Sequence, residues 1–186
     1  MKLLVMRHAD TDWNKIGYLS YTDISLSAQG RRRAEEAAKK LSDEGINAIA
    51  TSPLMRARET AEIIANFIGV PVRDDNRLRE VNFGVFEGLS KTEASEKFHE
   101  EFVLREKDKW NHAPEKGESY GNASMRVKDF MEALDSGKKT LVVTHATLIK
   151  LFLMMYGNAD LDAMESGPIN PCSCFELEAG KCRKLL

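Results

Sequence analysis

The stretch KTLVVTHATLIKLFLMMYG, residues 139–157, places a strand pattern directly before a helix pattern. Residues 139–145 form the strongest strand pattern in the chain, and residues 146–157 continue as an apolar helix that ends at Gly157. Strand and helix patterns alternate in this way along most of the chain. Such alternation indicates an α/β fold, a three-layer α/β/α sandwich with a mainly parallel central sheet.

The other predicted elements extend on both sides of this stretch. Strands are predicted at 2–6 and 46–52, helices at 28–44, 53–69 and 121–135, a charged and mostly helical segment at 90–110, and two strands within 172–186 around an Ala179–Gly180 turn. Ser27 is the expected N-cap of the first helix, and Pro53 occupies a first-turn position of the second. Gly45 and Gly69 are the expected stops of these helices.

Length and charge limit the classes of protein to consider. The 186 residues are expected to form one domain, 1–186, in which the polar segment at about 90–120 is an insertion over one edge. A formal net charge of -2 gives no bulk indication of a nucleic-acid or membrane-surface binder. No stretch has the pattern of a signal peptide or membrane span. With Cys172, Cys174 and Cys182 expected as reduced thiols, we predict a cytoplasmic location.

Three predicted loops that follow strands carry histidine or arginine. The first contains Arg7 and His8, the second contains Arg56, and the third contains Thr144 and His145. Ligands of open α/β sheets bind beyond the carboxyl ends of the strands. Two histidines and at least two arginines are therefore expected to meet at one edge of the sheet.

This group of residues suits a phosphate. Guanidinium groups match phosphate oxygens in a bidentate way, and a neutral imidazole can attack phosphorus. Nearby cations favour that neutral, nucleophilic form. Glu80 is the candidate proton donor for the leaving oxygen, with Glu87 as a weaker one. Taken singly, each residue also has a structural explanation, such as capping or solvation, so the residues alone leave both interpretations equally open.

Motifs along almost the whole chain resemble the histidine phosphatase superfamily, also called the phosphoglycerate mutase-like family. Its opening signature, Arg-His-Gly-Glu-Thr-x-x-Asn, is resembled by VMRHADTDWN at 5–14. Further resemblances, in the family's order, are DISLSAQGRRRA at 23–34, TSPLMRARETA at 51–61, the acid-bearing LREVNFGVFEG at 78–88, GES at 117–119 and VVTHATLIK at 142–150. The resemblance implies a phosphoglycerate mutase-like fold, whose active site the insertion would cap.

The resemblance also implies a role for each matching residue. His8 would be the phosphorylated nucleophile, Glu80 would be the acid and base, and Arg7, Arg56 and His145 would bind the phosphoryl group. The substrate-binding positions would be Asn14 at the pocket wall, Ser119, Thr144, and Ala146 through its backbone. The family needs no metal, and neither a metal nor another cofactor is expected here.

The chain departs from the family pattern at several positions. Ala9 and Ala146 stand where the family usually has glycine, and both lie beside a predicted pocket histidine. Their methyl groups could narrow the approach of the substrate or demand ordinary backbone angles. Asp10 replaces the commoner Glu or Gln, and residues 18–22 lack the family's glycine, which leaves phosphate contacts there open. Since no catalytic group is lost, we expect activity with altered substrate preference.

The expected function is metal-independent hydrolysis of a small phosphorylated metabolite through a phosphohistidine intermediate. Only residues 81–116 separate Glu80 from the GES triplet, which favours a phosphatase over the longer mutase branch. The alternatives are a mutase-type phosphotransferase, a non-catalytic module that binds phosphorylated ligands, and a phosphatase of protein phosphohistidine or phosphoserine. The expected partner is the metabolite, without nucleic acid or membrane, and a homodimer is left open.

Segment 83–119 would set the identity of the substrate. Trp110, Asn111 and His112 are candidates for the pocket wall, because aromatic and amide groups often orient a ligand. We favour a packing role for Trp110 within the insertion and a loop position for His112.

Overall fold

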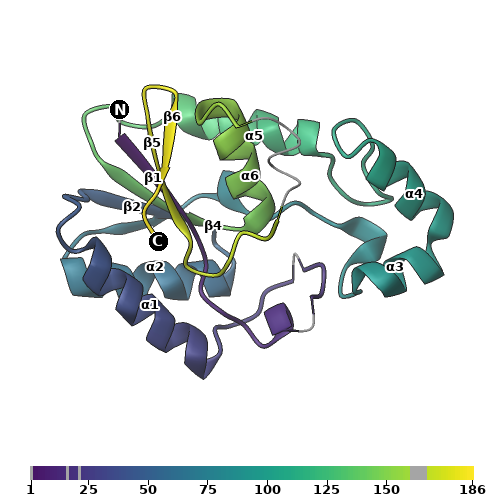
Figure 1. The fold of residues 1–186 in the computed structure, drawn as a ribbon, viewed down its shortest axis with the longest axis horizontal. Helices are drawn as coiled ribbons and strands as arrows, with labels where there is room; N and C mark the ends of the chain where they lie inside the picture. Colours follow the sequence, from purple (N-terminus) through teal and green to yellow (C-terminus); the bar gives the residue numbers. More distant parts are fainter. Residues whose placement is uncertain (1, 16, 21, 160–166) are drawn as a thin grey trace.

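The computed structural model describes residues 2–15, 17–20, 22–159 and 167–186. Its described residues form a six-stranded sheet of order β3-β2-β4-β1-β5-β6 (Figure 1). The strands are β1 (Lys2–Arg7), β2 (Ala48–Thr51), β3 (Val72–Asp74), β4 (Thr140–Thr144), β5 (Cys174–Glu178) and β6 (Lys181–Lys184). The first four run parallel, whereas β5 and β6 pair antiparallel. The predicted mainly parallel sheet is therefore confirmed.

Helices cover both faces of this sheet (Figure 1). One face carries α1 (Ala28–Leu41) and α2 (Met55–Ile68), and the other carries α5 (Tyr120–Glu132) and α6 (Ala146–Tyr156). Successive side chains of β1 point to opposite faces, so Leu4 and Met6 join the α1–α2 core while Leu3 and Val5 join the α5–α6 core. The predicted three-layer sandwich is confirmed.

The helix ends agree only in part with the predicted signals. Ser27 caps α1 by accepting a backbone N–H at 3.0 Å, and Gly69 ends α2 with a left-handed φ of 74°. However, α1 ends at Leu41, before the predicted end at 44. The start of α2 is at Met55, so Pro53 lies in the turn that precedes the helix.

The C-terminal hairpin was predicted, whereas one strand was missed. β5 and β6 are joined by Ala179 and Gly180, whose φ angles of 49° and 74° are both left-handed. Two left-handed residues make the type I′ turn that matches strand twist. β3 was not predicted, because three largely exposed residues carry no hydrophobic alternation.

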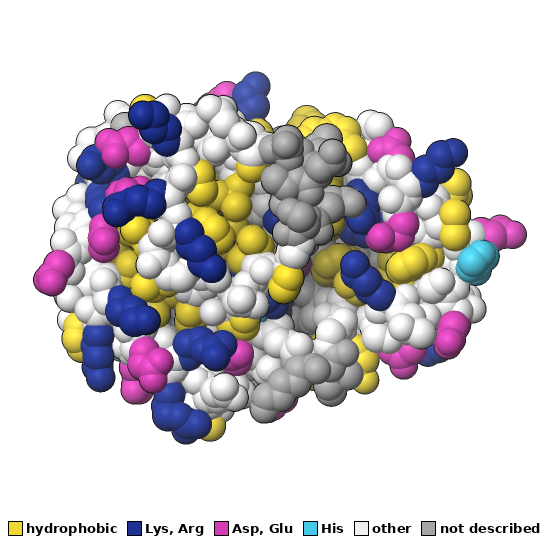
Figure 2. All heavy atoms as spheres, in the orientation of Figure 1, with side chains coloured by type: hydrophobic (Ala, Val, Ile, Leu, Met, Phe, Trp, Pro, Cys, Tyr) yellow, Lys and Arg dark blue, Asp and Glu magenta, His cyan; other side chains and the backbone are white. Residues whose placement is uncertain are grey.

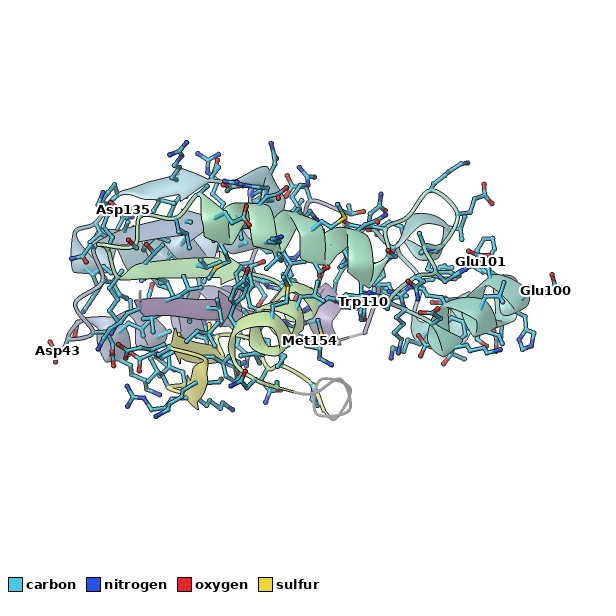
Figure 3. All side chains as sticks on the ribbon, turned by 90° about the horizontal axis from the view of Figure 1, so that it is seen from above. Asp43, Glu100, Glu101, Trp110, Asp135 and Met154 are labelled. Carbon is cyan, nitrogen blue, oxygen red and sulfur yellow. The ribbon has the colours of Figure 1, made fainter. Side chains whose placement is uncertain are left out.

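The segment predicted at 90–110 as a charged, mostly helical stretch contains two helices, α3 (Lys91–Lys97) and α4 (His99–Lys107), which we call the helical arm. The arm lies at one end of the molecule, beyond the carboxyl ends of the parallel strands (Figures 1 and 3). Phe98 separates the two helices, and its ring packs edge-on against Phe86 with the centroids 6.1 Å apart. The arm is therefore attached through a small apolar contact of its own.

The face drawn in Figure 2 has no large patch of side chains of one charge sign. Lys and Arg side chains alternate there with Asp and Glu, in keeping with the small net charge. Among the described residues, no helix combines the length and apolar character needed to cross a membrane.

Candidate active site

The two predicted pocket histidines meet where β1 and β4 end. These strands pair in parallel with Arg7 opposite Thr144, so the next residues, His8 and His145, leave the sheet side by side. The His8 N–H donates to the Thr144 carbonyl oxygen at 2.9 Å, and the two imidazole centroids are 5.2 Å apart. The parallel register of β1 and β4 thus brings together two histidines that lie far apart in the sequence.

His8 lines a cavity of about 140 Å³, which we call the histidine pocket. The predicted site residues that line it are Arg7, His8, Asn14, Arg56, Glu80 and Ala146. The other lining residues are Trp13, Tyr18, Leu19, Ser20, Ile24 and Phe83. Among the described residues, no group of three or more His, Cys, Asp or Glu side chains is arranged to hold a metal ion.

Two arginines, the buried Arg56 and the half-buried Arg7, make the histidine pocket positive. Burial lowers the pKa of Arg56 to about 10, and burial also lowers the pKa of Arg7. Both side chains remain cationic at neutral pH, because an arginine in a protein keeps its proton. Each guanidinium has five N–H donors. Arg56 uses two of them on backbone carbonyls, and Arg7 donates to the carbonyl of Ile169.

The loop at 18–22 is held by Arg56 from one side and Glu87 from the other. Arg56 donates to two carbonyl oxygens of this loop, at 2.8 and 2.9 Å. The Glu87 carboxylate accepts both the N–H and the hydroxyl of Thr22 at 2.7 Å. Glu87 therefore anchors the loop, while Tyr21 lies outside the described residues.

The contacts of His8 fix its tautomer. Its Nδ1 lies 2.7 Å from the carbonyl oxygen of Ala9, and a carbonyl only accepts hydrogen bonds, so Nδ1 carries the proton. Burial, followed by the charges of Arg56 and Arg7, lowers the pKa of His8 well below 6.5. The ring is therefore neutral near neutral pH and keeps its lone pair on Nε2.

His145 is buried beside His8 with one nitrogen unused. Its Nε2 lies 2.8 Å from the hydroxyl oxygen of Ser52, and its buried Nδ1 has no hydrogen-bond partner. Burial and then Arg56 lower the pKa of His145 well below 6.5. A neutral ring whose Nε2 accepts the Ser52 proton would carry its own proton on Nδ1, where no acceptor is in place. His145 is not among the described residues that line the histidine pocket.

Glu80 brings a carboxyl group to the same pocket. One oxygen accepts the Val81 N–H at 2.9 Å, and the other accepts the Thr147 N–H at 3.3 Å, from the first turn of α6. Burial raises the pKa of Glu80, although these hydrogen bonds and the two arginines oppose the shift. A carboxyl group with a raised pKa can carry a proton at higher pH than an exposed one.

Two other predicted substrate-binding residues make structural contacts close by. The Thr144 hydroxyl donates to the Leu78 carbonyl at 2.8 Å. The Ser119 hydroxyl accepts a backbone N–H as the N-cap of α5. Neither residue is among the described residues that line the histidine pocket. Their contacts with substrate stay predictions.

The two alanines that replace family glycines have different surroundings. Ala9 is fully buried in the α1–α2 core, and its N–H donates to Thr60 at 3.0 Å. Ala146 lines both the histidine pocket and a neighbouring cavity. Neither has a left-handed φ. The third departure, Asp10, accepts hydrogen bonds from Arg33 on both carboxylate oxygens, at 2.9 and 3.0 Å.

A second cavity of about 600 Å³, the outer cavity, shares the lining residues Leu19, Phe83 and Ala146 with the histidine pocket. Its other lining residues are Lys91, Arg105, Glu106, Lys107, Asp108, Lys109, Trp110, Tyr120, Thr147 and Lys150. Sequence reasoning missed Arg105, because a charged segment is typical of a solvated helix and no local signal marks an arginine that turns inward.

The three residues that were candidates for the pocket wall have different surroundings in the structure. Trp110 lines the outer cavity and lies between the helical arm and the main body (Figure 3). The amide of Asn111 donates to Asp108, and His112 contacts the carboxylate of Glu101 at 2.9 Å. Trp110 therefore bounds the outer cavity, whereas the other two side chains are engaged within the insertion.

Known proteins resemble this chain over most of its length. A family model described as "Histidine phosphatase superfamily (branch 1)" matches residues 3–186. "Phosphoserine phosphatase 1" of Hydrogenobacter thermophilus is 31% identical, with 87% of this chain and 78% of that protein covered. "Probable phosphoglycerate mutase GpmB" of Serratia proteamaculans is 34% identical, with 78% and 69% covered. The solved structure of Bacillus stearothermophilus YhfR has a TM-score of 0.86 at 27% identity, with 98% and 94% covered.

Proposed function

The chain belongs to the histidine phosphatase superfamily, and we propose that it is a metal-independent phosphomonoesterase that hydrolyses a small phosphorylated metabolite. The observation that carries the proposal is the state of His8. Its proton is held on Nδ1 by Ala9, which leaves Nε2 as a neutral nucleophile between two cationic arginines. Such an imidazole is suited to attack a phosphorus atom whose oxygens the arginines hold.

In the first step, a phosphohistidine forms. The Nε2 of His8 attacks phosphorus, so an N–P bond forms as the ester P–O bond breaks. Arg7 and Arg56 stabilise the phosphoryl oxygens, and the Nδ1–H of His145 donates to one of them. Glu80 gives its proton to the leaving oxygen, a role supported by burial that raises its pKa.

In the second step, water releases the phosphate. The Glu80 carboxylate, now deprotonated, takes a proton from the attacking water. The new P–O bond forms as the N–P bond breaks, which returns His8 to its neutral state. One carboxyl group therefore serves as acid and then as base, and the cycle needs no redox partner.

The proposal also includes the arrangement of the domain around the active site and the location of the enzyme. The insertion at about 90–120 would cap the active site of a single domain, an arrangement supported by the outer cavity between the arm and the histidine pocket. Ser119 and Thr144 would contact substrate after local adjustment, because their hydroxyls are engaged in the present structure. The proposed location is cytoplasmic.

The test is phosphate release from 4-nitrophenyl phosphate in buffer that contains EDTA. Turnover that is lost in His8→Ala and kept in the exposed-site control Arg32→Met supports the proposal. Loss of wild-type turnover on EDTA addition would contradict metal independence. Phosphate binding without turnover of any phosphoester would instead indicate a binding module.

A mutase is the second candidate function, because curated relatives include a probable phosphoglycerate mutase. The two functions differ in the acceptor of the phosphoryl group, which is water in a phosphatase and a second hydroxyl in a mutase. Incubation with 3-phosphoglycerate, followed by assay of both 2-phosphoglycerate and free phosphate, separates them. We expect free phosphate to exceed the isomer.

A further inference from the structure

The backbone that carries Glu80 lies outside any strand or helix. Residues 79–83 connect two short 3₁₀ helices, Asn76–Leu78 and Gly84–Phe86, so no ladder of hydrogen bonds fixes their position. A proton donor has to lie within hydrogen-bond reach of the leaving oxygen. The side chains that bind this backbone therefore decide where the Glu80 carboxyl group lies.

One guanidinium group binds two carbonyl groups of this part of the chain. Arg126, from α5, donates through Nη1 to the carbonyl oxygen of Arg77 at 2.5 Å and through Nη2 to that of Glu80 at 3.3 Å. The Thr144 hydroxyl donates to the carbonyl of Leu78, which lies between them. Arg126 therefore contacts both ends of the stretch that delivers Glu80 to the histidine pocket.

The Glu118 carboxylate fixes the direction of this guanidinium. Its two oxygens accept hydrogen bonds from Nε and Nη2 of Arg126 at 2.7 and 2.8 Å, which makes a bidentate pair. The two side chains are only 20% and 19% exposed. The N–H of Glu118 also donates to the Asn82 carbonyl at 2.8 Å. The ion pair is thus joined to the backbone on both sides of Glu80.

The Glu80 carboxyl group depends on where its backbone lies. One oxygen accepts the N–H of the neighbouring Val81, whereas the other accepts the N–H of Thr147 at 3.3 Å, from a segment 67 residues away. The contact with Thr147 holds only while the backbone at Glu80 keeps its distance from α6. Arg126 binds the carbonyl of this same residue, so its removal bears directly on that distance.

We propose that Arg126 is a positioning residue for the acid and base of the reaction. It holds the backbone at Arg77 and Glu80, with Glu118 as its brace, and so places the Glu80 carboxyl group beside the leaving oxygen. Arg126 is not among the described residues that line the histidine pocket, so it acts through Glu80 and not on the substrate. The inference rests on the proposed function, in which Glu80 is the acid and base.

Arg126→Met should impair esters according to their leaving group. For an alkyl phosphate, kcat/KM should fall by about 10- to 100-fold, because a misplaced carboxyl group protonates the leaving oxygen poorly. The 4-nitrophenyl ester should lose much less, since its leaving group needs no proton. The matched control Lys128→Met removes an exposed cation from the same helix and should keep both values. Equal losses for the two esters would show that Arg126 only stabilises the packing of α5.

A double-mutant cycle tests whether Arg126 acts through Glu80. In a Glu80→Gln protein, adding Arg126→Met should lower kcat/KM for the alkyl ester little further, because the group that Arg126 positions is gone. Losses that multiply would overturn the inference. If Arg126→Met does not fold, Arg126→Lys replaces it in both experiments, because lysine keeps the charge without the planar fork. We expect the same selective loss from this variant.

A measurement without turnover separates this inference from the proposed function. The backbone amide signals of Val81 and Thr147 in NMR spectra report the ionisation of Glu80, whose oxygens they contact. In wild-type protein, both signals should shift over the same pH range. In Arg126→Met, the shift at Thr147 should be lost while that at Val81 remains, even if wild-type protein hydrolyses nothing. Unchanged shifts at both amides would contradict the positioning role even if hydrolysis is efficient.

Discussion

The imidazole of His8 and the carboxyl of Glu80 share one pocket, and burial moves their pKa values in opposite directions. Burial and two arginines lower the pKa of His8, while burial raises that of Glu80. His8 is therefore deprotonated, and Glu80 is protonated, over a wider range of pH than each group would be in water. A nucleophile has to be deprotonated while a proton donor has to be protonated, and the two opposite pKa shifts favour both states at one pH.

A Glu80→Gln substitution should affect alkyl and aryl phosphates unequally. Glutamine cannot protonate the leaving oxygen, so kcat/KM for an alkyl phosphate should fall by about 100-fold or more. 4-Nitrophenolate leaves without a proton, so kcat/KM for its ester should fall much less. Steady-state rates for both esters, with exposed Glu35→Gln as the control, provide the measurement. Equal losses would contradict the acid role of Glu80.

The same substitution should alter how stability depends on pH. The folded chain holds the Glu80 proton more tightly than the unfolded chain does, because burial raises the pKa. Stability from this group is therefore present at low pH and falls as pH rises from the unfolded pKa through the folded pKa. Glu80→Gln should raise Tm at pH 7 more than at pH 4. Thermal scans that show the same difference at both pH values would refute this.

At the scale of elements, the first turn of α1 packs closely against the backbone of the loop that follows β1. The Asp10 carbonyl oxygen accepts both the N–H and the hydroxyl of Ser27, the N-cap of α1. A Cβ atom at Gly30 would overlap this same oxygen. The first turn of α1 therefore fixes the backbone two residues beyond His8.

Gly30→Ala should displace that loop and destabilise the protein. Overpacking of this kind costs about 1–3 kcal/mol, and turnover should fall as well because the loop carries His8. Urea denaturation gives the stability, and the neighbouring exposed Gln29→Ala is the control. A Gly30→Ala protein as stable and active as the control would show that the loop adapts freely.

Local signals predicted some element boundaries and failed at others. Ser27 and Gly69 act locally, through one hydrogen bond and one left-handed angle, so sequence alone could identify them. The break between α3 and α4 lies at Phe98, whose ring contacts Phe86 in another segment. Tertiary contacts of this kind leave no mark in the residues next to the break.

At the scale of the molecule, one part of the candidate site could be predicted from the sequence and another part could not. A general rule places ligands at the carboxyl ends of parallel strands, so the meeting of His8, His145 and Arg56 could be predicted. The outer cavity arises when the helical arm folds against Phe83 and Tyr120, and no spacing in the sequence encodes that packing. The sequence therefore indicated the reactive end of the pocket and the segment, 83–119, expected to set the substrate, but not the packing that forms the outer cavity.

The helical arm should also be the less stable part of the molecule. Among the described residues, the hydrophobic cluster that the arm packs on holds three buried residues, Phe83, Phe86 and Ala94, and it is separate from the two large cores of the sandwich. Small cores open at lower free energy than large ones. In native-state hydrogen exchange, amides of α3 and α4 should exchange before those of β1 and β4. Equal protection of arm and sheet would contradict this.

The central claim is that His8 carries the phosphoryl group during turnover. The direct measurement is rapid quench under alkaline denaturing conditions with a substrate labelled on phosphate, followed by peptide mapping. We expect an acid-labile, alkali-stable label on Nε2 of His8, which forms and decays at rates compatible with kcat and is missing from His8→Ala. Turnover without label on His8 at any time, or label on His145 instead, would contradict the account.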